Sequence, residues 1–191
     1  MQVREIGTGL WWWTGRHPAW TPADGEPDGW AQEVGCIYYE GPDAVVLFDP
    51  LVPVEDPVRF YEALDRDVAR AGKPVRILLT VDAHARSAQQ LAERYGGTIG
   101  KLPGGVEIGA EALGELVFWL PEHRALVTGD VIIAREDGLC LPRTWIGEER
   151  LGEAVEALRP LLELPVERVL VTHGEPVLDG ARESLVQALA V

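Results

Sequence analysis

Short apolar runs alternate with longer amphipathic stretches along this chain, which is the pattern of an α/β protein. Runs rich in β-branched and aromatic residues predict strands, whereas apolar residues spaced three and four positions apart predict helices. The predicted strands are two short ones within residues 3–13, followed by 33–39, 44–48, 75–80, 98–100, 106–108, 115–120, 125–128 and 168–172. Helices are predicted between Asp56 and Gly72, between Ser87 and Gly97, over 148–162 and over 180–189.

The stretch from Ile77 to Gly97 joins a predicted buried strand to a predicted helix through a short polar loop. Ser87 and Gln90 have the spacing of a capping box, which predicts where the helix begins. In α/β proteins, loops at the ends of strands usually carry the binding or catalytic side chains. The side chains of this loop that have such chemistry are Asp82, His84 and Arg86.

Three further predicted strands also run directly into polar residues. These residues are Asp49 after the strand at 44–48, Asp130 after the strand at 125–128, and His173 after the strand at 168–172. Asp49 either orients a site residue or caps backbone N–H groups of the loop that follows it. We favour the capping role, because short acidic side chains commonly bond nearby backbone groups.

These landmarks, in this order, resemble the metallo-β-lactamase superfamily. In that family an early strand ends in Asp, a second runs into His-x-His-x-Asp-His, a third delivers a Gly-Asp metal ligand and a fourth a His-Gly ligand. The corresponding segments of this chain are residues 45–50, 77–97, 127–131 and 171–176. The resemblance implies an α/β fold, a four-layer αβ/βα sandwich formed by residues 1–191 as a single domain. It also implies that the strand-end loops meet at one edge.

The chain departs from the family at the metal-binding motif. The motif needs three His and one Asp, whereas this loop offers only Asp82 and His84. Aligned on the helix that follows, the loop is shorter than the motif, and His84 matches the last His. Val81 and Ala83 have no side-chain ligand atoms to replace the leading histidines. The resemblance therefore predicts that the dinuclear metal site of the family cannot be assembled here.

Composition narrows the possible partners. The chain has 191 residues, of which 47% are hydrophobic, and a net charge of −14. Nucleic acids and anionic membranes are bound mainly through Lys and Arg, so we expect neither as a partner. The two cysteines, Cys36 and Cys140, do not indicate a disulfide framework. Without a signal-peptide pattern or a long apolar run, we expect a cytoplasmic protein.

Two main interpretations of function remain open. In the first, the pocket is kept and the metal is lost. His84 is then a pocket residue held by Asp82 or Asp130, and Arg86 binds a small anionic ligand through its guanidinium group. This describes a non-catalytic or metal-free protein that binds a small molecule and has no cofactor. We favour it, because missing ligands lower metal affinity steeply.

In the alternative, one divalent metal ion such as zinc is bound by Asp82, His84, Asp130 and His173, since imidazoles and carboxylates are suitable donors. The protein is then a mononuclear metal-dependent hydrolase of an ester, thioester or amide, a substrate class implied by the family alone. A hydrolase without metal, with His84 or His173 as its base, is a third possibility. No Ser nucleophile is convincingly paired with either histidine.

Other segments contribute further pocket candidates. The Pro- and Gly-rich loop at 14–30 contains His17 and Trp20. It is either a flexible entrance loop or a surface loop with Trp20 pinned to the body of the protein. Residues 135–143 are predicted to form a loop, and we expect Trp145, which follows it, to form a wall of the pocket.

Two features of the sequence are interpreted as structural. The run from Leu10 to Trp13 concentrates indole rings, and we interpret it as sheet packing and not as a platform for a ligand, because strand residues alternate between faces. His123 lies in the turn of a predicted hairpin. We expect it to be a solvated surface residue.

Overall fold

The computed structural model describes residues 1–25, 28–100, 106–110 and 114–190. The chain forms two compact units. Unit 1 comprises Met1–Thr21 and Gln32–Leu102, and unit 2 comprises Pro22–Ala31 and Pro103–Val191. Among the described helices, none combines the length and the apolar character needed to cross a membrane.

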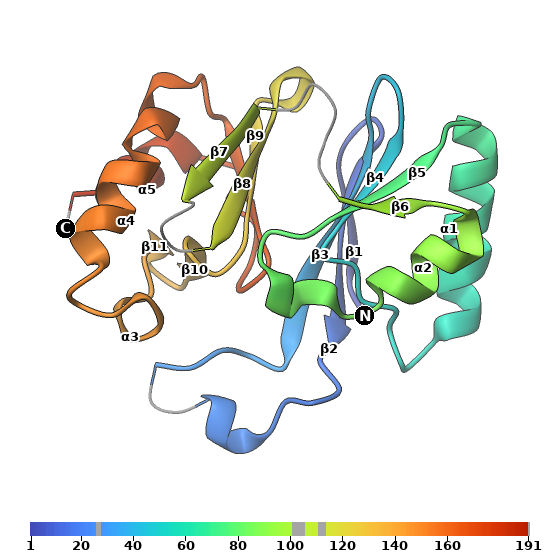
Figure 1. Cartoon of the computed structure of the whole chain (residues 1–191), viewed down its shortest axis with the longest axis horizontal. Coiled ribbons are helices and arrows are strands. Elements are labelled where there is room, and N and C mark those ends of the chain that lie inside the picture. The colour runs from blue at the N-terminus through green and yellow to red at the C-terminus, as the bar shows by residue number, and fades with distance from the viewer. Residues whose placement is uncertain (26–27, 101–105, 111–113, 191) are drawn as a thin grey trace. The chain divides into compact units, whose positions relative to one another are not determined.

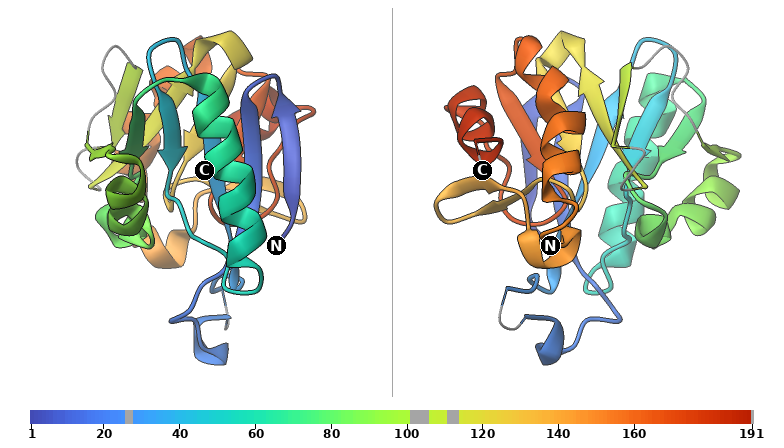
Figure 2. Two further views of the ribbon diagram at one scale, coloured as in Figure 1. Left: turned by 90° about the vertical axis from the view of Figure 1, so that its right-hand side faces the viewer. Right: turned by 60° about the vertical axis from the view of Figure 1, so that its left-hand side comes forward.

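Unit 1 is built on a six-stranded sheet with the order β1-β2-β3-β4-β5-β6 (Figure 1). Its strands are β1 (Val3–Gly7), β2 (Leu10–Arg16), β3 (Glu33–Glu40), β4 (Val45–Phe48), β5 (Val75–Leu78) and β6 (Thr98–Ile99). Strands β1 to β4 pair antiparallel, whereas β4, β5 and β6 run parallel. Parallel pairing needs crossover connections, which helices α1 (Pro57–Ala71) and α2 (Ala88–Tyr95) supply. Both helices lie on one face of this sheet (Figures 1 and 2).

The two helices of unit 1 begin in different ways. Helix α1 starts as predicted, because the Asp56 carboxylate accepts the backbone N–H of Arg59, and it ends at Gly72 in the left-handed conformation. The capping box predicted for α2 is wrong. The Ser87 hydroxyl makes no cap bond and instead accepts the N–H of Val52 at 3.0 Å, which ties the loop after β4 to α2.

The indole rings of β2 divide between the two faces of the sheet, as the alternation of strand residues requires. Trp12 and Trp13 are buried, which confirms the packing role predicted for them. The Trp13 indole donates to the Leu51 carbonyl at 3.0 Å and packs against Phe60 of α1. Trp11, on the same face as Trp13, is only half-buried.

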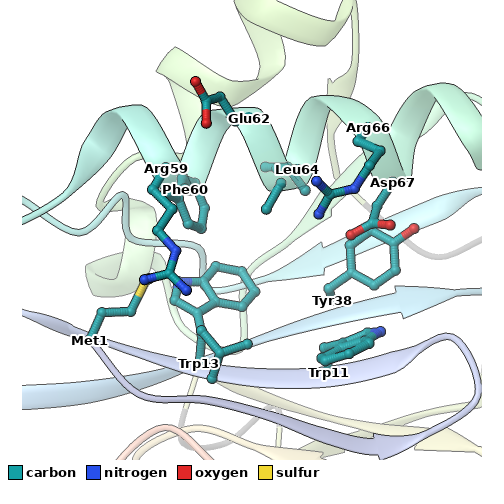
Figure 3. A pocket seen from close by; sticks show the side chains of 12 residues that line it. Met1, Trp11, Trp13, Tyr38, Arg59, Phe60, Glu62, Leu64, Arg66 and Asp67 are labelled. Atoms are coloured by element: carbon teal, nitrogen blue, oxygen red, sulfur yellow. The ribbon is translucent and has the colours of Figure 1, made fainter.

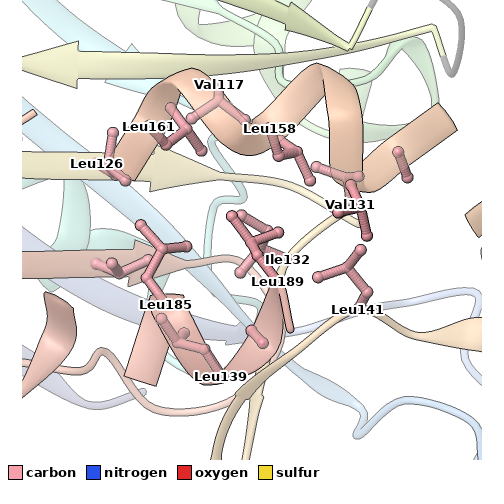
Figure 4. Packing of buried hydrophobic residues seen from close by; sticks show 14 of the residues in the cluster. Val117, Leu126, Val131, Ile132, Leu139, Leu141, Leu158, Leu161, Leu185 and Leu189 are labelled. Carbon is pink, nitrogen blue, oxygen red and sulfur yellow. The ribbon is translucent and has the colours of Figure 1, made fainter. Parts of the chain in front are cut away.

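Unit 2 contains a four-stranded sheet with the order β12-β9-β8-β7. Its strands are β7 (Val106–Ala110), β8 (Glu115–Leu120), β9 (Ala125–Thr128) and β12 (Arg168–Val171). Strands β8 and β9 form the predicted hairpin, and β9 runs parallel to β12. Helices α4 (Leu151–Leu158) and α5 (Ala181–Ala188) pack against this part of the chain and enclose an apolar core (Figure 4). Members of that core include Val117, Leu126, Ile132, Leu158 and Leu185.

The segment at 135–143, predicted as loop, contains more regular structure than expected. It belongs to a hairpin of β10 (Ile133–Arg135) and β11 (Gly138–Cys140), followed by α3 (Arg143–Ile146). The hairpin is stabilised from outside, since Leu139 is buried and its N–H donates to the Ser184 hydroxyl of α5 at 2.8 Å. These contacts join residues far apart in the sequence and cannot be inferred from local patterns. The segment was therefore predicted as a loop because of the polar residues at the tip of the hairpin.

The C-terminal helices also differ from their predicted limits. The helix predicted over 148–162 begins at Leu151 and gives way to a 3₁₀ turn, Arg159–Glu163, because Pro160 cannot donate an α-helical hydrogen bond. Helix α5 was predicted to begin at Gly180, but it begins at Ala181. Gly180 takes the cap position instead, in the left-handed conformation and with no side-chain cap bond.

Gly174 provides a test of how the backbone after β12 is packed. Its φ is +98°, and a Cβ atom built there would lie 2.1 Å from the Ala134 carbonyl oxygen. We expect Gly174→Ala to lower the free energy of unfolding by about 2 kcal/mol or more, because it combines backbone strain with a clash. Urea denaturation followed by circular dichroism measures the change.

Gly152→Ala is the matched control for that substitution. Gly152 lies inside α4, and a Cβ atom there would meet nothing within 4 Å. We expect this variant to gain roughly 0.5–1 kcal/mol from helix propensity. Equal stability of the two variants would contradict the packing described for Gly174.

Candidate functional site

A buried polar cluster occupies the ends of β4 and β5 in unit 1. Asp49 follows β4 and is completely buried. Its carboxylate accepts hydrogen bonds from the backbone N–H of Thr80, at 2.8 Å, and from the Thr80 hydroxyl. The His84 Nδ1 atom lies 3.0 Å from Asp49 Oδ2 and 3.1 Å from Thr80 Oγ1. The cluster forms because β4 and β5 are parallel neighbours, so the residues that follow them lie at the same edge.

The contact with Asp49 decides the state of the His84 ring. A carboxylate accepts hydrogen bonds, so the Nδ1 atom of His84 carries a proton and the lone pair of the neutral ring lies on Nε2. The ring is held in one tautomer and one orientation. Metal-binding histidines usually have this kind of support. Asp49 therefore orients His84, a predicted site residue, and the capping role that we favoured for it is wrong.

The other two candidates of this loop have different surroundings. Asp82 is exposed on the short 3₁₀ turn Asp82–Ala85, so the carboxylate that holds His84 is Asp49 and not Asp82. Arg86 is half-buried, and its Nη1 atom donates to the carbonyl oxygens of Gly35 and Asp49, at 3.2 and 3.0 Å. Part of its guanidinium group is thus bound to backbone.

Unit 2 brings together a second acid and a second histidine. Strands β9 and β12 are parallel, with Thr128 opposite Val171, so Asp130 and His173 follow them at the same edge. The His173 Nε2 atom lies 3.1 Å from Asp130 Oδ1. His173 is buried and Asp130 is half-buried. The pair is local to unit 2 and combines two donor types that divalent metal ions accept.

Two indole rings pack edge-on against His173. The ring centroids of Trp30 and Trp145 lie 5.4 and 5.3 Å from that of His173. The Asp28 carbonyl accepts hydrogen bonds from the Trp145 indole N–H and from Arg135, which fixes the loop to α3 and β10. Trp145 thus lies beside the predicted site residue His173, and its role as a wall of a pocket stays a prediction. Trp30 was not singled out from the sequence, although it lies in the loop whose His17 and Trp20 were.

The remaining histidines are placed by backbone contacts. His17 follows β2 in unit 1, where its N–H donates to the Gln32 carbonyl at 2.8 Å and its carbonyl accepts the N–H of Trp20. Trp20 is thus held in a local turn within the loop, and its attachment to the body of the protein stays a prediction. His123, expected to be solvated, is half-buried, and burial lowers the pKa of its imidazole.

Comparison with known proteins finds similarity in structure and not in sequence. No protein-family model matches the chain, and no curated protein matches it. The DIM-1 metallo-β-lactamase superposes with a TM-score of 0.60 at 11% identity, covering 98% of this chain and 96% of that one. A metallo-β-lactamase family protein from Thermus thermophilus gives 0.54 at 16% identity, covering 97% and 80%.

A flavodiiron protein from Giardia intestinalis also superposes, with a TM-score of 0.63 at 10% identity, over 99% of this chain and 58% of that one. Identities this low show likeness of fold alone. The fold class inferred from the four strand-end segments is confirmed: the chain has the metallo-β-lactamase fold.

Proposed function

We propose that the protein binds a single divalent metal ion through His84, Asp130 and His173 and hydrolyses an ester, thioester or amide. The observation that carries the proposal is the buried hydrogen bond between His84 and Asp49, which presents one ring nitrogen as a ligand. Asp82 is left out of the ligand set that we predicted from the sequence, because it is exposed.

The donor set fits one ion and not two. Val81 and Ala83, where the family motif has histidines, have no side-chain ligand atoms. Two imidazoles and one carboxylate are ordinary donors for zinc, and three protein ligands are typical of catalytic sites that keep a position open. When bound, such an ion polarises a carbonyl oxygen and lowers the pKa of a coordinated water.

The protein's own residues supply orientation and shielding. In unit 1, Asp49 accepts the Nδ1 proton of His84, which puts the lone pair of the neutral ring on Nε2. In unit 2, Trp30 and Trp145 pack against the buried His173 ring and shield it. The assignment of ligands from both units to one ion is supported by the order of the strand-end segments along the sequence.

Arg86 distinguishes this proposal from the metal-free interpretation, in which its guanidinium group binds an anionic ligand. Its Nη1 atom already donates to two backbone carbonyls of unit 1. A guanidinium group engaged in this way has fewer donors for bidentate binding of a carboxylate. This contact favours a structural role for Arg86 and, with it, the metal-dependent function.

The tautomer of His84 is the first testable consequence. In long-range ¹H–¹⁵N spectra of the neutral form, we expect its Nδ1 to be protonated and its Nε2 to be bare, because Asp49 accepts the Nδ1 proton. Asp49→Asn should lower the free energy of unfolding by about 1–3 kcal/mol, since an amide has fewer acceptor sites for the Thr80 and His84 donors. A protonated Nε2 in the wild-type spectrum would contradict the proposed ligand role.

Metal content is the second test. We expect chelator-free protein, loaded with zinc and desalted, to retain one equivalent per chain by mass spectrometry. His84→Ala and His173→Ala should each weaken binding by at least roughly tenfold, because each removes a ligand. His123→Ala removes a half-buried histidine outside the proposed set and should retain the metal. Absence of metal under every loading condition would end the proposal.

Hydrolysis of model ester, thioester and amide substrates is the third test. We expect turnover only by zinc-loaded protein, and loss of turnover in His173→Ala, because the bound ion supplies the polarisation. If the protein binds one equivalent of metal but turns over none of these substrates, the metal site is supported and the hydrolase function is contradicted.

A further inference from the structure

A pocket of about 700 Å³ lies within unit 1, alongside α1 and against β1, β2 and β3 (Figure 3). Its volume is in the range of small-molecule sites. None of its lining residues belongs to the proposed metal site. The residues that the argument uses are Trp11, Trp13, Tyr38, Phe60, Arg59 and Arg66.

The floor of the pocket is aromatic and already ordered. Trp11 and Trp13 point to the same face of β2, and Trp11 is paired with Tyr38 of β3 in the sheet register. Trp13 is fixed by its bond to the Leu51 carbonyl and by Phe60, whose ring centroid is 5.6 Å away. Trp11 is half-buried, so part of its ring remains open to the pocket. Such a floor suits a flat apolar group.

Two arginines on α1 give the pocket its charge. Arg59 and Arg66 are seven positions apart, which places them on one face of the helix at about 10 Å along its axis. Both guanidinium groups point into the pocket in Figure 3. Within the described residues, neither guanidinium group makes a hydrogen bond or an ion pair.

The acidic residues at the pocket do not cancel this charge. Asp67 is paired with Arg70 at 3.5 Å, and Arg70 also bonds Glu40. The Glu62 carboxylate points away from the other side chains of the pocket in Figure 3. The charge in the pocket that is not balanced by a neighbouring residue is therefore positive.

Tyr38 adds a phenol hydroxyl, which can donate a hydrogen bond, to the lining of the pocket. The Tyr38 hydroxyl is buried and makes no hydrogen bond of standard geometry with the described residues. Burial, and secondarily the nearby charge of Glu40, raises the pKa of Tyr38 to about 12, so its proton is retained. A ligand with several acceptor atoms would satisfy this lining.

We propose that this pocket binds a planar aromatic carboxylate, with its ring against Trp11 and Tyr38 and its carboxylate on a guanidinium group of α1, that of Arg59 or Arg66. A guanidinium group matches a carboxylate in a bidentate arrangement, and the indole face matches the ring. The site is additional to the proposed hydrolase function and does not depend on it, since the two share no residue.

Isothermal titration calorimetry of the full chain with 2-naphthoate tests the proposal. The neutral probe 2-naphthamide has the same ring system without the charge. We expect 2-naphthoate to bind at least roughly tenfold more tightly than 2-naphthamide, because charge-assisted bonds to arginine are lost in the amide. Equal affinities, or no binding of 2-naphthoate up to its solubility limit, would overturn the proposal.

Variants localise the binding. The double variant Arg59→Gln/Arg66→Gln and the single variant Trp11→Ala should each weaken 2-naphthoate binding by roughly tenfold, the first through charge and the second through stacking. Arg16→Gln is the control for charge, because Arg16 is exposed, pairs with Glu55 at 3.4 Å and does not line the pocket. Unchanged affinity in the double variant, or equal loss in Arg16→Gln, would overturn the assignment.

Indole N–H signals provide a readout that does not depend on the variants. Addition of 2-naphthoate should shift the Trp11 signal in ¹H–¹⁵N spectra, because the ring current of the probe acts at short range. Trp12 lies on the opposite face of the sheet and is buried, so its signal should not move. Shifts confined to indoles other than Trp11 and Trp13 would place the probe elsewhere and refute the proposed site.

Discussion

The polar cluster at the ends of β4 and β5 depends on the hydrogen bonds of the buried Asp49 carboxylate. A buried carboxylate without partners costs several kcal/mol, so its bonds to Thr80 and His84 are required and not incidental. The backbone of Asp49 is used as well, since its N–H donates to Leu78 and its carbonyl accepts from Arg86. Its φ of +46° is unusual for a residue other than glycine. These bonds hold that strained conformation in place.

The same construction occurs twice in the chain, with a chemical difference. In each unit an aspartate follows one strand and a histidine follows its parallel neighbour, because parallel strands deliver their carboxyl ends to one edge. In unit 1 the acid contacts Nδ1 of His84, whereas in unit 2 it contacts Nε2 of His173. Asp49 therefore orients the His84 ring through its Nδ1 atom, while Asp130 lies beside the Nε2 atom of His173. This difference gives the two acids separate roles.

The features that the sequence predicts depend on neighbouring residues, whereas those that it misses depend on contacts between residues far apart in the chain. The strands and the start of α1 follow from local patterns, whereas the fold was predicted from the resemblance of the four strand-end segments to the metallo-β-lactamase superfamily. The role of Asp49 depends on the register of β4 against β5, which places it beside His84 across 35 positions. The Ser87 bond to Val52 and the packing of Trp30 on His173 are likewise tertiary. The residue types at those positions, taken alone, predict caps and surface loops. The tertiary contacts give them other roles.

The net charge of −14 acts differently on the two proposed sites. At long range an acidic protein attracts divalent cations and repels anions, which helps metal binding and opposes binding of a carboxylate. Physiological salt screens these fields beyond about 8 Å. Anion binding beside α1 must therefore come from contacts at short range, through Arg59 or Arg66. Their guanidinium groups are suited to this, because Asp67, an acid of the same helix that also lines the pocket, is already paired with Arg70.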